Sequence, residues 1–189
     1  MPELPEVETV RRGMAPLLVG QTVQGITLRR TDLRWPIPAS RVRRLRGRTC
    51  ERVWRRSKYL QLHFTGAGSP VALIHLGMSG RLSVDALQNG DPHPAFRPHE
   101  HWRMDFGRYL LRYVDARRFG MLDVVPRQQL HDHWLIRDLG PEPLGNGFDG
   151  ESLFRLSRRR RVALKSLLMD SRNVAGVGNI YASEACFHA

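Results

Sequence analysis

Apolar positions along the chain follow a helical period first and a strand period afterwards. Val7, Val10, Met14 and Leu17 recur at spacings of three and four, which predicts an amphipathic helix that ends near Gly20. One helix followed by many short strands predicts an α+β fold, with the helix laid across a two-sheet β-sandwich or a barrel-like sheet. The expected strands are marked by Ile26 and Leu28, by Val53, by Leu60, Leu62 and Phe64, by the continuous apolar run 71–76, by Trp102, Met104 and Phe106, and by the runs 109–114 and 121–125.

Two stretches rich in glycine and proline interrupt these patterns. Residues 89–98 read as a mobile surface loop, and residues 139–147 read as an interdomain linker. After that the apolar spacing is helical again, broken by the arginine run 158–161 and by a glycine-punctuated turn at 174–179. We therefore predict an N-terminal catalytic β-sandwich domain at 1–136, a linker at 137–150 and a helical module at 151–189.

The charge balance favours a polyanionic partner. Thirty Lys and Arg residues face eighteen Asp and Glu residues, for a net charge of +12, and the phosphate backbone of nucleic acid is the commonest such partner. A membrane surface is the competing interpretation, but no apolar run approaches the ~18 residues of a spanning helix. We expect no signal peptide before Pro2. We expect a cytoplasmic monomer that binds no membrane.

The cysteine count bears on cofactors. Cys50 and Cys186 lie far apart and form no Cys-x-x-Cys pair. Two cysteines are too few for a four-cysteine zinc site, so we expect neither a metal nor another cofactor in this chain.

Lysine is scarce. Lys58 and Lys165 are the two lysines among thirty cationic residues. Arginine does not give up its proton, whereas lysine can be tuned to act as an acid or a base. A lysine kept among so many arginines is therefore a candidate for proton transfer, and the alternative is that two lysines persist by chance.

The N-terminus offers a second candidate. A small second residue permits removal of Met1, which would leave Pro2 as a secondary amine that titrates near pH 7.7–8.0, like other α-amino groups. Such an amine can attack an electrophilic carbon and hold it as an iminium ion. Glu3 and Glu6 lie close enough in sequence to shuttle protons for it. The alternative is an ordinary helix start, with Pro5 at the first position and acids facing the dipole.

Five motifs resemble, in order and over nearly the whole chain, segments of the bacterial formamidopyrimidine-DNA glycosylases. These bifunctional base-excision repair enzymes use an N-terminal proline. Leu4, where the sibling endonuclease VIII group typically has glycine, favours the formamidopyrimidine branch. The motifs are Met-Pro-Glu-Leu-Pro-Glu-Val-Glu-Thr at 1–9, Arg-Ser-Lys-Tyr-Leu at 56–60, His-Leu-Gly-Met-Ser-Gly at 75–80, Asp-Ala-Arg-Arg-Phe-Gly at 115–120, and the stretch 164–181, which resembles the helix–two-turn–helix module of this family.

The resemblance implies a reaction and its residues. The expected reaction is removal of oxidised purines, chiefly 8-oxoguanine and formamidopyrimidines, followed by β,δ-elimination. Pro2 would attack the sugar C1′, and Glu3 would supply or relay the proton that opens the sugar. Glu6 would orient these groups. Lys58 would contact phosphate and assist elimination.

The resemblance also implies a DNA-binding surface. Met78 would enter the gap left by an extruded nucleotide, Arg117 would contact the orphaned cytosine, and Phe119 would wedge into the stack. Base flipping costs a few kcal/mol, and a wedge recovers about 1–3 kcal/mol of stacking. Ala116 stands where the family usually has proline, which affects loop stiffness more than the chemistry. The other positions implied to bind DNA are His75, His99, Arg160, Lys165, Asn179 and Tyr181.

The sequence departs from the family pattern at its C-terminal end. Members continue through the rest of the helical module, a lesion-sensing loop and a four-cysteine zinc finger whose arginine is credited with δ-elimination. We therefore expect a fragment or a natural truncation, with an incomplete helix–two-turn–helix module at 151–189 and weakened duplex affinity and lesion choice. The expected partner is double-stranded DNA with oxidised purines or abasic sites. A non-catalytic DNA-binding remnant and a basic protein without a nucleic-acid role are the alternatives.

Overall fold

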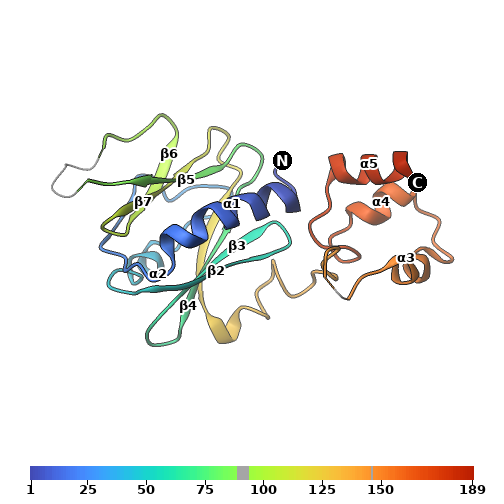
Figure 1. The fold of residues 1–189 in the computed structure, drawn as a ribbon, viewed down its shortest axis with the longest axis horizontal. Helices are drawn as coiled ribbons and strands as arrows, with labels where there is room; N and C mark the ends of the chain where they lie inside the picture. The colour runs from blue at the N-terminus through green and yellow to red at the C-terminus, as the bar shows by residue number, and fades with distance from the viewer. Residues whose placement is uncertain (89–93, 146) are drawn as a thin grey trace.

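The computed structural model describes residues 1–88, 94–145 and 147–189. A sandwich of strands occupies one end of the molecule and three short helices occupy the other (Figure 1). The helices are α1 (Leu4–Leu18), α2 (Ala39–Arg43), η1 (Arg127–Gln129, a 3-10 helix), α3 (Gly150–Ser157), α4 (Leu164–Met169) and α5 (Asn179–His188); the strands are β1 (Gly25–Leu28), β2 (Cys50–Arg56), β3 (Tyr59–Phe64), β4 (Pro70–His75), β5 (Arg81–Ala86), β6 (Glu100–Asp105), β7 (Tyr109–Val114) and β8 (Met121–Pro126).

Two antiparallel sheets form the sandwich. One has the strand order β1-β6-β7-β5 and the other has the order β2-β3-β4-β8. Helix α1 packs on β2, β3 and β5 and so touches both sheets. In Figure 1 it runs across the strands with its N-terminal end toward the three C-terminal helices. The predicted α+β fold, with an N-terminal helix on a two-sheet sandwich, is confirmed.

Strand β4 shows why the continuous apolar run at 71–76 was informative. It lies between β3 and β8 and is buried on both faces. Ala72 and Ile74 belong to the main core between the sheets, whereas Val71 and Leu73 pack in a second cluster outside the sandwich, covered by the segment after β8. A strand buried on both faces carries apolar residues at successive positions, so its sequence shows no alternation of apolar and polar residues.

Helix α1 differs slightly from its predicted face. Val7 and Met14 are buried as expected, but Leu18 completes the face at the C-terminal end, where Leu17 is half-buried. The helix ends before Gly20, which has a φ of +83° and turns the chain away.

The periodicity missed strand β5 and helix α2, as well as the 3-10 helix η1. Edge strand β5 pairs with β7 and carries two half-buried apolar residues, Leu82 and Val84; the single-turn helix α2 buries Val42 alone. Both are too short and too polar for a strong period. Of the loop predicted at 89–98, residues 89–93 lie outside the described residues, and the carbonyls of Pro94 and Ala95 accept hydrogen bonds from buried arginines of β6 and β7.

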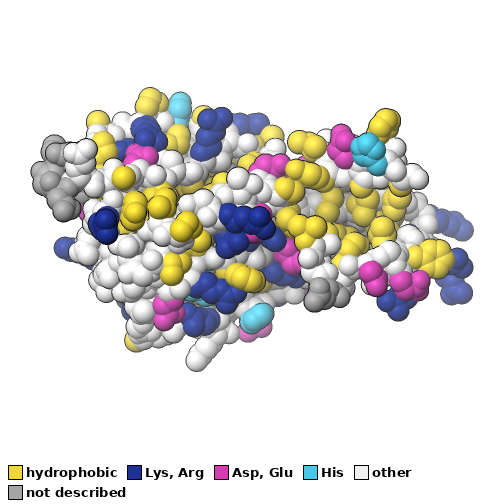
Figure 2. Space-filling view, viewed as in Figure 1, with side chains coloured by type: hydrophobic (Ala, Val, Ile, Leu, Met, Phe, Trp, Pro, Cys, Tyr) yellow, Lys and Arg dark blue, Asp and Glu magenta, His cyan; other side chains and the backbone are white. Residues whose placement is uncertain are grey.

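The C-terminal helices form only a small core. Leu168, Val174 and Ala182 are its buried residues. Figure 2 shows hydrophobic side chains gathered on the surface of this part of the molecule, where an apolar groove of about 480 Å³ opens between α1, α4 and α5. Within the described ranges, no helix is both long and apolar enough to cross a lipid bilayer. The domain limits at 136 and 151 stay predictions.

Candidate active site

Glu3 joins the start of the chain to its last helix. Its buried carboxylate accepts hydrogen bonds from the backbone N–H groups of Gly178 at 2.7 Å, Ile180 at 2.9 Å and Tyr181 at 3.3 Å. A helix leaves such N–H groups unpaired at its N-terminus, where the dipole also favours negative charge. Glu3 is itself the N-cap residue of α1. One side chain therefore lies at the N-termini of two helices.

Two glycines allow this approach. Gly176 has a φ of +85°, and a Cβ there would meet the Leu4 side chain at 2.8 Å. A side chain at Gly178 would collide with the Glu3 carboxyl group. The Leu4 N–H also donates to the Gly176 carbonyl at 3.0 Å. The group that approaches this turn in the structure is a carboxylate of the chain itself.

Glu6 completes the arrangement at the N-terminus. It accepts hydrogen bonds from the Glu3 N–H at 2.8 Å and from the Tyr181 hydroxyl at 3.0 Å. Burial acts to raise the pKa of Glu6, but these hydrogen bonds and the Met1 ammonium bring it below its ordinary value. Pro2 is half-buried beside them. Its nitrogen forms an amide with Met1, so removal of Met1 would create the amine.

Lys58 lies in the two-residue turn between β2 and β3, whose last pair is Arg56 with Tyr59. It lies one residue before β3. Burial lowers the pKa of Lys58, and the carboxylates of Glu3 and Glu6 oppose that shift. The structure thus brings Lys58 into the electrostatic reach of both predicted proton carriers. An amine with a lowered pKa exchanges its proton more readily at neutral pH.

His75 ends β4 beside this cluster. Burial lowers its pKa to about 4, and the cations of Lys58 and Arg34 add to the shift. Its ring lies 5.0 Å from that of Tyr59, and its Nδ1 accepts a hydrogen bond from the Gly77 N–H at 3.1 Å. A neutral imidazole that accepts at Nδ1 carries its proton on Nε2. His75 therefore offers a neutral N–H donor.

The two loops predicted to enter DNA pack against each other. A side chain at Gly77 in the first loop would collide with the backbone of Phe119 in the second. Met78 is 47% exposed and Phe119 is 40% exposed. The Arg117 guanidinium lies 4.7 Å above the Phe119 ring. Apolar side chains that are exposed on adjoining loops fit a wedge better than a place in the core.

Asp115 holds these loops together, and its role was missed in the sequence. Fully buried, it accepts hydrogen bonds from the Ser79 hydroxyl at 2.5 Å, the Tyr113 hydroxyl at 2.9 Å, the Gly120 N–H at 2.9 Å and the Arg117 N–H at 3.2 Å. Burial acts to raise its pKa, but these donors bring it below the ordinary value. The sequence did offer a signal for Asp115: an acidic residue that follows a buried strand and precedes a loop ending in glycine.

The other positions predicted to bind DNA lie on separate segments of the chain. His99 is exposed with a φ of +60°, and its carbonyl accepts from the Asp115 N–H at 3.0 Å. Arg160 is exposed between α3 and α4, Lys165 is half-buried in the first turn of α4, and Asn179 is exposed in the first turn of α5. Their contacts with DNA stay predictions.

A metal site is a separate question. Among the described residues, no three His, Cys, Asp or Glu side chains come together in a way that could hold a metal ion. The expected absence of a cofactor stays a prediction.

Comparisons with known proteins cover both parts of the chain. Residues 1–122 match the family model of the formamidopyrimidine-DNA glycosylase N-terminal domain, and residues 139–189 match that of the H2TH domain of the same enzymes. The chain is 47% identical over 193 residues to formamidopyrimidine-DNA glycosylase of Cereibacter sphaeroides ATCC 17025, with all of this chain and 68% of the relative covered. It is 52% identical over 191 residues to that of Stenotrophomonas maltophilia R551-3, with 100% and 67% covered.

Comparison with solved structures points to the same enzymes. Lactococcus lactis formamidopyrimidine-DNA glycosylase bound to DNA that contains an abasic site matches with a TM-score of 0.83 at 31% identity, covering 96% of this chain and 67% of that one. The same enzyme with DNA containing N7-benzyl-Fapy-dG matches with a TM-score of 0.83 at 31% identity, covering 97% and 65%. The chain spans about two thirds of the length of these relatives. With both of its parts matched in order and its two-sheet sandwich reproduced in the solved structures, the chain belongs to the formamidopyrimidine-DNA glycosylase family.

Proposed function

We propose that this chain is a base-excision repair DNA glycosylase and abasic-site lyase that removes oxidised purines through a Schiff base on its N-terminal proline. One observation carries the proposal: Glu3 and Glu6 at the N-terminus, the Lys58 turn and the start of α5 meet at one place. Segments this far apart in sequence could pack against one another without gathering titratable side chains at their contact. Perturbed ionisable groups gathered in this way are typical of catalytic centres.

The residues suit the following reaction. The Pro2 amine, freed by removal of Met1, forms a bond to the sugar C1′ as the bond from C1′ to the base breaks, and the proton that the amine loses neutralises the departing base. Glu3 supplies or relays the proton to the ring oxygen O4′ as the C1′–O4′ bond opens, which leaves an iminium ion between Pro2 and C1′. Lys58 then assists removal of a C2′ proton, and the 3′ phosphate leaves by β-elimination. Glu6 and Tyr181 keep Glu3 in place.

The proposed partner is double-stranded DNA with oxidised purines or abasic sites. The exposed side chains of Met78, Arg117 and Phe119 suit the filling of a gap in the stack, and an arginine can satisfy the base that has lost its partner. His75 and Lys58 would meet the phosphates next to the lesion. His99, Arg160, Lys165 and Asn179 would contact the backbone farther out. We further propose a monomer that acts on chromosomal DNA in the bacterial cytoplasm.

Borohydride trapping on an abasic duplex tests the proposal. The reagent reduces the iminium ion and fixes the protein to DNA, and mass spectrometry of the N-terminal peptide should place the adduct on Pro2. Glu3→Gln should slow the trapping. The absence of any adduct, under conditions where a full-length relative reacts, would contradict the proposal. Salt-sensitive binding that Pro2→Gly leaves unchanged, together with no adduct, would instead identify a non-catalytic DNA-binding protein.

A further inference from the structure

We propose that Glu142 is a positioning residue that fixes the turn carrying Lys58 and thereby couples the active site to the segment between the sandwich and the helices. The inference rests on the proposed role of Lys58. Glu142 lies in the predicted linker, 84 positions after that lysine (142 minus 58).

The turn needs support because of its conformation. Ser57 and Lys58 alone connect β2 to β3, and Ser57 has a φ of +55°. Residues with a Cβ rarely adopt this left-handed conformation and persist in it only where the surroundings impose it. Ser57 is only 2% exposed. Its backbone groups therefore depend on protein partners, because a buried N–H without a partner is costly.

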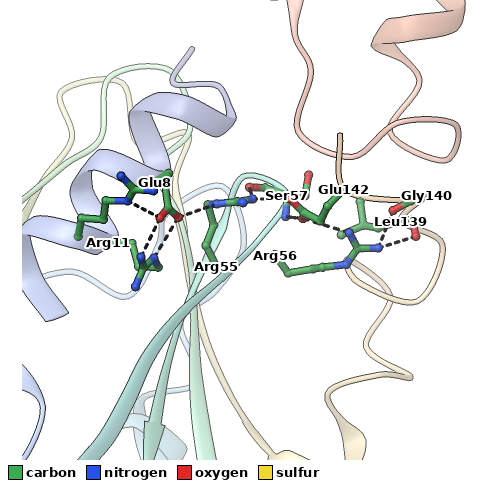
Figure 3. A network of polar contacts seen from close by, with 9 residues as sticks. Glu8, Arg11, Arg55, Arg56, Ser57, Leu139, Gly140 and Glu142 are labelled. Carbon is green, nitrogen blue, oxygen red and sulfur yellow. Dashed lines mark hydrogen bonds and ion pairs between the residues drawn. The ribbon is translucent and has the colours of Figure 1, made fainter. Parts of the chain in front are cut away.

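Glu142 supplies these partners directly and through Arg55. Its Oε1 accepts the Ser57 N–H at 2.6 Å and the Arg56 Nη1 at 3.0 Å, and its Oε2 accepts the Arg55 Nη1 at 2.8 Å. The same Arg55 Nη1 donates to the Ser57 carbonyl at 2.8 Å. One carboxylate thus controls both backbone groups of the strained residue next to Lys58. Figure 3 shows Glu142 pointing at the turn with both arginines around it.

The network reaches two other elements. Arg55 Nε donates to Glu8 of α1 at 3.1 Å, and Arg56 Nη2 donates to the carbonyls of Leu139 at 2.8 Å and Gly140 at 2.6 Å (Figure 3). The Lys58 turn is therefore held from the helix that begins at the active site and from the segment that leads to α3. A shift of that segment would move the turn, because Glu142 binds Ser57 itself.

The competing explanation is an ion-pair cluster that merely fastens residues 139–142 to the sandwich. The two explanations differ in what happens to the Lys58 amine. This chain has two lysines, so ¹³C reductive dimethylation gives two lysine methyl signals besides that of the N-terminal amine. Lys165→Arg assigns them, and Lys165 serves as an internal control. The titration needs no DNA and no activity.

The expected results are specific. In the parent chain, the Lys58 signal should titrate below the ordinary value of a lysine because burial lowers its pKa, although the carboxylates of Glu3 and Glu6 oppose that shift. Glu142→Asp keeps the charge but is one methylene too short to reach the Ser57 N–H. It should move the Lys58 titration toward the ordinary lysine value and leave the Lys165 signal unchanged. Glu142→Gln keeps an oxygen for the Ser57 N–H and should preserve most of the lowering at Lys58.

Activity gives an independent readout. On an abasic duplex, Glu142→Asp should reduce kcat for strand cleavage on the order of ten- to a hundredfold, as a small misplacement of a catalytic group does, while borohydride trapping stays at the parent level. Glu51→Gln is the matched control, since this exposed carboxylate pairs with Arg127 on the sandwich surface. In this variant, kcat for strand cleavage and borohydride trapping should both stay at the parent level.

A Lys58 titration in Glu142→Asp that equals that of the parent chain would overturn the inference, whatever happens to activity. An equal shift of Lys58 and Lys165 would also overturn it, because the effect would then be general. If the parent chain cleaves no DNA and forms no adduct, the proposed function fails, yet the titrations still decide whether Glu142 positions Lys58. These two failures are therefore distinguishable.

Discussion

The Glu3 carboxylate accepts a hydrogen bond from the Gly178 N–H at 2.7 Å, across 175 positions of sequence. The contact means that the helices are fastened to the sandwich at the proposed catalytic centre. Any loosening of the C-terminal helices should therefore first affect the groups proposed to transfer protons.

Glu3→Gln should destabilise the chain as well as slow catalysis. The amide keeps one oxygen but turns an NH₂ group toward N–H donors of α5. Disturbing buried hydrogen bonds to a charged group costs about 1.5–3 kcal/mol. Urea unfolding measures the loss, with Glu151→Gln on exposed α3 as the control. A free energy of unfolding equal to that of the control would show that the three N–H bonds contribute nothing net.

Gly178→Ala should destabilise the protein more than the small size of the added methyl group suggests. Its Cβ would collide with the Glu3 carboxyl group, so α5 or α1 must move. We expect a loss of about 1–3 kcal/mol, as for other small additions to packed sites, together with slower trapping on abasic DNA. Gly147→Ala is the control, because a Cβ there meets nothing within 4 Å. Equal stability of the two variants would refute the close approach.

His75 should make the protein less stable in mild acid. Its folded-state pKa of about 4 lies below the ordinary value, so between pH 6.5 and 4 only the unfolded chain binds this proton. Stability should then fall with falling pH by about 1.4 kcal/mol per unit from this group. His75→Gln should remove that slope, and His131→Gln, on the exposed segment after η1, should not. The measurement is urea unfolding at several pH values; parallel curves for the parent and His75→Gln would contradict it.

Asp115→Asn should disorganise both loops that are proposed to enter DNA. Because the folded-state pKa of Asp115 is lowered, its contribution is present above the ordinary pKa near 4 and is lost as the pH falls through the folded value. The difference in unfolding free energy between parent and variant should thus shrink below about pH 4. A difference that is constant down to pH 2 would show that the charge on Asp115 is unimportant.

Phe119→Ala should affect DNA binding rather than folding. The ring is 40% exposed, and loss of stacking worth about 1–3 kcal/mol weakens binding about five- to 150-fold. Fluorescence anisotropy with an abasic duplex measures it, with Phe187→Ala as the control at an 83% exposed position of α5. Equal affinities for the two variants would remove Phe119 from the wedge.

The sequence predicted the sandwich because its strands are either continuously apolar, like β4, or alternate cleanly, like β3. It missed β5, whose polar residues pair at an edge, because edge pairing leaves little hydrophobic pattern. The N-terminal acids and Lys58 were singled out through their chemistry and through resemblance. Asp115 was missed although its place between a buried strand and a glycine-containing loop was a local signal. Glu142 escaped because its partner Ser57 lies 85 positions away, and no local pattern records such a contact.

The bond between Glu3 and the start of α5 also has a consequence for biosynthesis. A nascent chain that has emerged through β8 possesses every strand that the structure describes, but its Glu3 carboxylate still lacks the N–H groups of Gly178, Ile180 and Tyr181. The proposed proton-transfer centre can therefore form these hydrogen bonds only after residue 181 has left the ribosome. During translation the strands of the sandwich exist before the Glu3 carboxylate has its three N–H donors.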